Sequence, residues 1–148
     1  MSKAAEIPFE TTLFVRDTCL CLHLQRAARA LARRFDDAMR PLGLTSGQFS
    51  MMMALNRPEP PSIGSVASLL SMDRTTLTAA LKPLQRRRLV TVMVDAGDRR
   101  SRRLRLTPAG RALLARAVPV WRRTHAEIDR LLPAAGADRL RRDLHALT

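Results

Sequence analysis

The chain has 148 residues, 46% of them hydrophobic, and carries 26 Lys and Arg against 13 Asp and Glu, a formal net charge of +13. The length fits one ordinary domain, and the apolar share can form a packed core, which excludes wholesale disorder. So large a positive excess points to a polyanion, most often nucleic acid and less often an anionic membrane surface.

Several other classes are excluded by what the sequence lacks. No apolar run approaches the roughly 20 residues that a membrane span needs, so no membrane partner is expected. Residues 1–8 lack a secretory hydrophobic segment, and two cysteines cannot hold a secreted scaffold together. The expected compartment is therefore a reducing cytoplasm.

The chemistry-bearing residues point to binding rather than to catalysis. The two cysteines and three histidines show no zinc-ligand spacing, and no Gly-rich phosphate loop occurs, so we expect no metal and no cofactor. No nucleophile, base or paired carboxylates stand in register for an enzyme. Because Tyr is absent and aromatic residues are only 3%, nucleic-acid binding should use charge and groove shape on a duplex.

The first predicted element is one long helix over residues 11–40. Apolar side chains recur at about 100° per residue from Leu13 to Ala38, and Pro41 and Gly43 end the pattern. Four arginines occupy the opposite face, which we interpret as solvated surface: Arg26, Arg29, Arg33 and Arg40. A helix this long exceeds the globular average, so its N-terminal half should pack on something beyond its own domain.

Two short helices are expected next. Thr45 and Gln48 are spaced as a capping box, which predicts a helix ending before Pro58. Ser62 can cap the second. The three methionines at 51–53 indicate adaptable core packing, with the lining of a ligand cavity as the alternative.

After a tight break at 71–72, Asp73 can cap a helix over 74–88. Pro83 lies inside it, so a kink or an end near Lys82 is expected. A short helix followed by a tight turn and a second helix is typical of a helix-turn-helix.

The pattern then changes to two strands, over 89–94 and 101–106, joined by a turn at 95–98. This hairpin is strongly basic and makes the helix-turn-helix winged. A further helix begins at Thr107 and Pro108 and runs toward residue 132, with a kink expected at Pro119. A last helix is expected over 137–147.

The unit suits duplex DNA, because short hydroxyls and one arginine at a helix N-terminus can approach base edges, while a narrow basic hairpin can enter a minor groove. The candidate DNA-binding residues on the helix are Arg74, Thr75, Thr76, Thr78 and Lys82. On the hairpin they are Asp98, Arg99, Arg100 and Arg102.

Three stretches resemble the MarR family of bacterial winged helix-turn-helix regulators. They are Leu-Thr-Ser-Gly-Gln-Phe at 44–49, Met-Asp-Arg-Thr-Thr-Leu-Thr at 72–78, and the run from Arg-Leu-Val at 88–90 to Leu-Thr-Pro-Ala-Gly at 106–110. The last is the most specific, because an acidic-x-Arg tip is followed at fixed spacing by Leu-Thr-x-x-Gly.

The resemblance implies a mainly α fold with a small β-hairpin wing, formed by 1–148 as a single domain. Residues 45–106 would form the winged DNA-binding unit, and 11–40 and 108–148 the dimerisation helices of a homodimer. It further implies that Arg100 enters the minor groove while Asp98 orients the tip. The function implied is that of a repressor released by a small, often aromatic and acidic, molecule.

The residues support a dimer independently, because the first helix and the segment 121–147 are apolar beyond the needs of the winged unit. Trp121 is expected in the dimer core, with a role in a ligand wall as the alternative. A two-fold dimer places two recognition helices about one DNA turn apart, which predicts a palindromic operator.

Other interpretations stay open. The hairpin arginines can be a solvated charged surface, and the threonine hydroxyls can bond locally to the backbone. A non-specific architectural DNA-binding protein is the rival function.

The cysteines raise one more alternative. Residues 17–29 resemble the OhrR branch of the family, whose cysteine near this position senses organic peroxide, and Cys21 aligns with that sensor. The branch's tyrosine partners are missing, with Gln25 and Phe35 near their places. Two residues apart on one helix, Cys19 and Cys21 cannot bridge without breaking it. We expect Cys21 at the edge of the apolar stripe and Cys19 pointing away. A small buried interface cysteine is the simpler interpretation.

Overall fold

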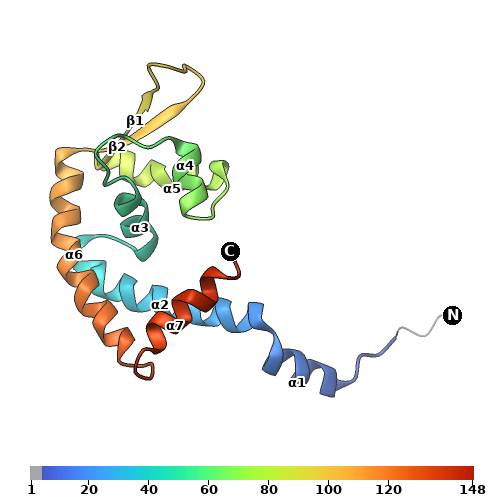
Figure 1. Cartoon of the computed structure of the whole chain (residues 1–148). Helices are drawn as coiled ribbons and strands as arrows, with labels where there is room; N and C mark the ends of the chain where they lie inside the picture. The colour runs from blue at the N-terminus through green and yellow to red at the C-terminus, as the bar shows by residue number, and fades with distance from the viewer. Residues whose placement is uncertain (1–4) are drawn as a thin grey trace.

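The computed structural model describes residues 5–148. Residues 1–4 lie outside the described residues. They belong to the segment expected to lack a secretory signal and to the single domain expected over 1–148. The chain is mainly helical with one two-stranded hairpin, which confirms the predicted fold class (Figure 1). In the described part, no helix combines the length and the apolar character that crossing a membrane requires.

The predicted helix over 11–40 is two helices, α1 (Phe9–Thr18) and α2 (Leu20–Met39), so the expectation of one continuous helix is wrong. The chain is extended at Cys19, with φ −69° and ψ 108°. The Thr18 hydroxyl donates to the Phe14 carbonyl at 2.7 Å, and such local bonding competes with helix continuation. α1 buries no residue and projects away from the rest of the chain (Figure 1), so no packing opposes the break.

A 3₁₀ turn, η1 (Arg40–Leu42), follows α2 and ends at Gly43, whose φ of 65° is left-handed. The helix α3 (Ser46–Ala54) then begins with the predicted capping box. Gln48 N–H donates to the Thr45 hydroxyl, and Thr45 N–H donates to the Gln48 side chain, both at 3.1 Å. The predicted cap of α4 (Ile63–Leu69) is also present, since Ser65 N–H donates to the Ser62 hydroxyl.

The helix α5 (Arg74–Arg86) forms as predicted over most of 74–88 and runs through Pro83 for another turn, so of the two expected effects of the proline the end near Lys82 is wrong. Its apolar face supplies three of the most deeply buried side chains, Leu77, Leu81 and Leu84. Because Leu84 lies just beyond Pro83 and is 0% exposed, its burial opposes the loss of one backbone hydrogen bond at the proline.

The hairpin consists of β1 (Val90–Val94) and β2 (Arg102–Leu106), antiparallel, with Val90 opposite Leu106 and Val94 opposite Arg102. Leu104 and Leu106 point into the core. Along the edge that does not pair with β1, β2 meets the residues that lead into α4. There Leu104 N–H donates to the Pro61 carbonyl at 2.9 Å. The base of the wing is therefore part of the core.

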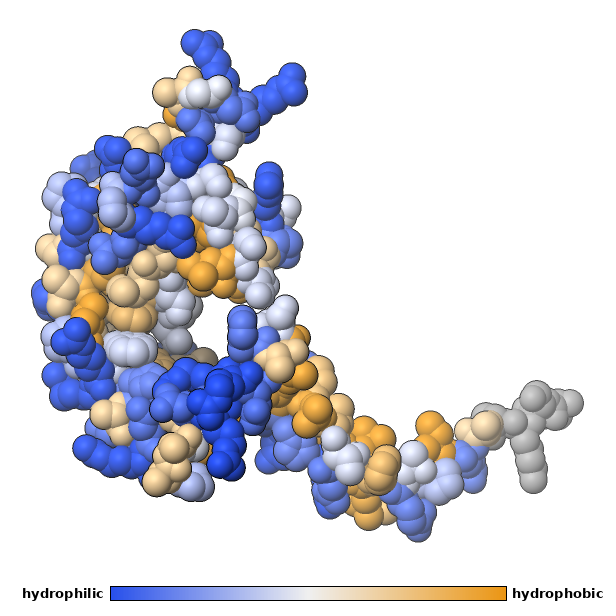
Figure 2. All heavy atoms as spheres, viewed as in Figure 1, coloured by the Kyte–Doolittle hydropathy of each residue, from blue (hydrophilic) through white to orange (hydrophobic). Residues whose placement is uncertain are grey.

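The helix α6 (Pro108–Asp129) packs on α2 and α3, and α7 (Gly136–His145) follows it. Pro119 lies inside α6, as expected. Large apolar side chains stay exposed on the terminal helices. Figure 2 shows hydrophobic residues along the projecting segment formed by α1 and the beginning of α2. Phe14 and Leu20 are 66% and 67% exposed, and Leu140 is 42% exposed. Surfaces of this kind mark interfaces.

Candidate DNA-binding interface

The N-terminus of α5 is fixed by Asp73, whose carboxylate accepts from Thr76 N–H at 2.7 Å and from the Thr76 hydroxyl at 2.6 Å. These bonds, the hydroxyl's first, lower the pKa of the Asp73 carboxyl. The cap leaves the first turn of α5 on the surface, with Arg74, Thr75 and Thr78 all exposed. A helix N-terminus carries partial positive charge, so this end favours phosphate.

Two of the three threonines bond locally, as the alternative interpretation expected. Thr76 is engaged by Asp73, and the Thr78 hydroxyl donates to the Arg74 carbonyl at 2.8 Å. Their hydroxyl hydrogens are thus occupied, while a methyl and acceptor lone pairs remain on each side chain. In this arrangement the two side chains can contact a thymine methyl as well as hydrogen-bond donors.

Arg74 lies over the beginning of α4, where Gly64 has no side chain. A Cβ built on Gly64 would lie 2.8 Å from the Arg74 Nη2 atom. The absence of a side chain at Gly64 therefore leaves room for the Arg74 guanidinium. Lys82 is exposed on the same helix, two turns further along.

The tip of the wing is a tight turn that the backbone and Asp98 hold together. Arg100 N–H donates to the Asp98 carboxylate at 3.0 Å, and Ser101 N–H donates to the Asp98 carbonyl at 2.9 Å. The Arg102 guanidinium folds back onto the carbonyls of Arg99 and Ser101. Arg102 therefore braces the turn.

The side chains of Arg99 and Arg100 are exposed at this tip, and among residues 5–148 neither guanidinium has a hydrogen-bond or ion-pair partner. In Figure 2 the projecting hairpin is predominantly hydrophilic. The wing thus presents two unpaired cations at the end of a narrow hairpin whose turn is held by the bonds of Asp98 and Arg102.

Sequence reasoning missed the pair that supports the wing from below. Arg103 Nε donates to the Asp95 carboxylate at 3.1 Å, and Arg103 Nη1 donates to the Pro60 carbonyl at 3.0 Å. The bond from Gly97 N–H, and then the Arg103 bond, lower the pKa of Asp95. The signal was an acidic residue at the end of the first strand and an arginine near the start of the second, within one hairpin.

The exposure of the two cysteines is the reverse of what was expected. Cys21 is exposed, while Cys19, at the break between α1 and α2, is partly buried. The side-chain amide of Gln25 donates to the Cys21 sulfur at 3.2 Å, so Gln25 does partner this thiol. Both cysteines are free, as expected, although Cys19 stands at the break between two helices rather than inside one.

A cavity of about 480 Å³ lies between α3, α4 and α6. Phe49, Met53 and Trp121 line it, together with Arg122. The Trp121 ring stacks against Phe35 and Phe49, with centroids 6.4 and 6.2 Å apart. Of the three methionines, Met53 lines this cavity, whereas Met51 and Met52 are core.

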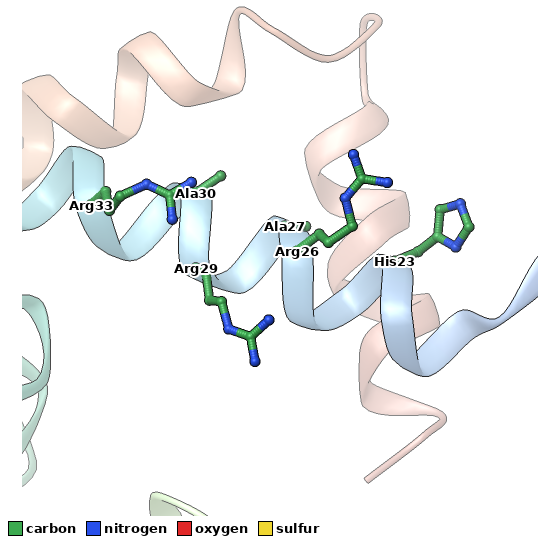
Figure 3. Close-up of a pocket in the computed structure, with 6 residues that line it drawn as sticks. All are labelled: His23, Arg26, Ala27, Arg29, Ala30 and Arg33. Carbon is green, nitrogen blue, oxygen red and sulfur yellow. The ribbon is translucent and has the colours of Figure 1, made fainter. Parts of the chain in front are cut away.

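A second recess of about 500 Å³ follows α2 and is basic (Figure 3). It is lined by His23, Arg26, Arg29 and Arg33, with two alanines between them. Arg26 and Arg29 extend to opposite sides of the helix in this view. Within residues 5–148, no group of three His, Cys, Asp or Glu side chains is placed to hold a metal ion.

The known proteins that this chain is similar to are transcription regulators. The sequence model of the MarR family matches residues 44–101. The transcriptional activatory protein BadR of Rhodopseudomonas palustris is 34% identical over 95 residues, which cover 62% of this chain and 54% of BadR. The chain thus spans about half the length of that curated relative.

Two solved structures superimpose over most of the chain. The transcriptional regulator MosR of M. tuberculosis, in complex with DNA, is 40% identical with a TM-score of 0.79, covering 87% of this chain and 92% of that one. The transcriptional repressor CouR, bound to a 23-mer DNA duplex, is 28% identical with a TM-score of 0.81, covering 97% and 99%. CouR is also known bound to p-coumaroyl-CoA.

Proposed function

Because this chain belongs to the MarR family of transcription regulators, we propose that it is a homodimeric, sequence-specific DNA-binding repressor that a small anionic aromatic molecule releases from its operator. One observation carries the proposal. The exposed N-terminus of α5 and the unpaired arginines of the wing tip belong to one packed unit, in which Asp73 caps the helix and Arg103 braces the wing.

In this proposal, the first turn of α5 enters the major groove. Arg74 reads base edges, and the methyl groups of Thr76 and Thr78 face the thymine methyls, because their hydroxyl hydrogens are occupied. Thr75 and Lys82 complete the helix contacts, Lys82 by meeting phosphate. Arg99 and Arg100 enter the flanking minor groove, where a narrow A·T tract attracts cations.

The dimer would be formed by the terminal helices, 11–40 and 108–148, whose exposed apolar side chains need a cover. A two-fold axis then places two winged units, each 45–106, on half-sites about 10–10.5 base pairs apart. The operator is accordingly a palindrome, and the protein works by binding rather than by catalysis, in the cytoplasm. CouR and MosR, both solved with DNA, support this arrangement.

The aromatic cavity is where the effector would bind. It is walled by α3 and α4 of the winged unit and by α6, so an occupant changes the distance between the two DNA-reading units of the dimer. By linkage, the ligand weakens DNA binding only by its differential affinity for the two arrangements. Phe49 and Trp121 suit an aromatic ring, and Arg122 suits its acidic group. The p-coumaroyl-CoA complex of CouR supports an aromatic acyl ligand.

Trp121 is the only tryptophan in the chain, so its fluorescence reports directly on this cavity. We expect an aromatic acid such as p-coumarate, or its thioester, to quench the fluorescence saturably and to lower DNA affinity in the same concentration range. The control is Met53→Arg, which should fill the cavity and abolish both effects. Quenching without any change in DNA affinity would contradict the effector role.

A second candidate function is peroxide sensing by Cys21. The exposed thiol and its bond from Gln25 support this candidate. Cys21→Ser should then keep DNA binding but lose its release by an organic hydroperoxide. Unchanged release in that variant would eliminate this candidate.

A further inference from the structure

A third recess, of about 290 Å³, lies at the base of the wing, on the side of β2 that faces the loop between α3 and α4. Three arginines line it, each from a different segment: Arg57 from the loop, Arg105 from β2 and Arg111 from the beginning of α6. Leu104 and Leu106, which are 0% and 2% exposed, also line it. The three arginines are themselves exposed, so a ligand can reach them from solvent.

No carboxylate compensates these arginines within residues 5–148. The ion pairs of the described chain involve none of the three, and no acidic side chain lines the recess. Arg111 also lies near the positive end of the α6 dipole, whose first turn contains no acidic residue. Like charges gathered at a helix N-terminus repel one another unless an anion is bound between them.

We propose that this recess binds a backbone phosphate of DNA lying outside the segment that the wing tip reads. The inference rests on the proposed function and extends it, because it lengthens the operator beyond the two wings. Three guanidinium groups with five donors each match the oxygens of a phosphate.

Continuity with the wing favours DNA over a free anion. Arg105 lies on β2, the strand that leads back from the tip, and Arg103 of the same strand anchors that strand to Pro60. The distance from Arg102 to Leu106 along the strand is about 13 Å, from a rise of about 3.3 Å per residue. Arg105, the recess arginine on this strand, is about 10 Å from Arg102, so DNA that contacts the wing tip passes close to the recess.

The test compares two duplexes containing the sequence selected by the protein from a random pool. One ends at the predicted wing contacts, and the other is longer by about 10 base pairs, one helical turn, on each side. Binding is measured by fluorescence anisotropy at several salt concentrations for the wild type, Arg111→Ala and Arg57→Ala. Arg116→Ala is the matched control, because Arg116 is an exposed arginine further along α6 that does not line the recess.

We expect the wild type to bind the longer duplex with a steeper dependence on salt. Each phosphate contact adds about 0.9 to the slope of log K against log salt, so two recesses per dimer add about 2. Arg111→Ala and Arg57→Ala should lose this increment and still bind the short duplex normally, while Arg116→Ala keeps it. Circular dichroism melting checks that all variants are folded.

Equal slopes for the wild type and both recess variants on the longer duplex would overturn the inference. A melting temperature raised by inorganic phosphate in the wild type alone, with no change in DNA binding, would also overturn it by assigning the recess to a free anion. If the wild type selects no sequence at all, the proposed function fails, which is distinct from failure of the recess alone.

Discussion

Gly110 provides a sharp test of how the wing is joined to the rest of the chain. It is the third residue of α6, and a Cβ placed on it would lie 2.1 Å from the Leu89 carbonyl oxygen. Normal contacts are above 3.4 Å, so Gly110→Ala must push α6 away from the beginning of β1. That movement also strains the bond from Thr107 N–H to the same carbonyl, now 3.0 Å long.

The two opposing effects of Gly110→Ala differ in size. Alanine favours a helix over glycine by about 0.5–1 kcal/mol, whereas overpacking costs about 1–3 kcal/mol and a strained hydrogen bond about 1 kcal/mol more. We therefore expect the free energy of unfolding to fall by about 1–3 kcal/mol. With a urea m-value of about 2 kcal/mol/M, the midpoint falls by roughly 0.5–1.5 M.

The matched control is Gly47→Ala in α3, because a Cβ there meets nothing within 4 Å. Only the helix preference acts at that position, so stability should rise by up to about 1 kcal/mol. Both variants and the wild type are unfolded in urea at the same protein concentration, since a dimer's midpoint depends on it. A Gly110→Ala variant as stable as the wild type would refute the close contact between α6 and Leu89.

Three further predictions concern the interface itself. Arg100→Ala should weaken DNA binding by about 1–3 kcal/mol in an anisotropy titration while the melting temperature is unchanged, and full affinity would mean that the wing tip does not touch DNA. Gly64→Ala should displace the Arg74 guanidinium and relax the base preference at one operator position, with little effect on non-specific binding; an unaltered preference would show that the place of Arg74 is unimportant. The pKa of Asp95 is lowered in the folded chain, so its stabilising contribution is complete above the unfolded value near 3.9 and is lost as the pH falls through the folded value. Asp95→Asn should therefore flatten the loss of stability in acid, and an identical acid unfolding curve would contradict that contribution.

Local signals predicted most of the fold because each needs only a few neighbouring residues. The caps at Thr45, Ser62 and Asp73, and the hairpin, are set by side-chain bonds and alternation within one element. The break at Cys19 was missed and the expected end of α5 near Lys82 was wrong, because both depend on tertiary packing. α1 has no packing to keep it continuous with α2, while the burial of Leu84 carries α5 past its proline.

The candidate site was predicted in its composition but not in its internal bonds. Charge and spacing pointed to the first turn of α5 and to the arginine-rich hairpin. They did not show that Arg102 and Arg103 brace the wing while Arg99 and Arg100 remain unpaired, because five arginines in seven residues look alike in sequence. The bracing role of Arg103 depends on the position of Pro60, some forty residues earlier, which only the folded chain defines.

The central claim is that two copies of this chain present paired reading units to one duplex. Selection of bound fragments from a random pool of duplexes, followed by sequencing, tests it most directly. The account predicts enrichment of an inverted repeat whose half-sites are about 10–10.5 base pairs apart, flanked by A·T-rich steps at the wing positions. A pool that shows no enrichment, or that converges on a single unpaired half-site, would contradict it.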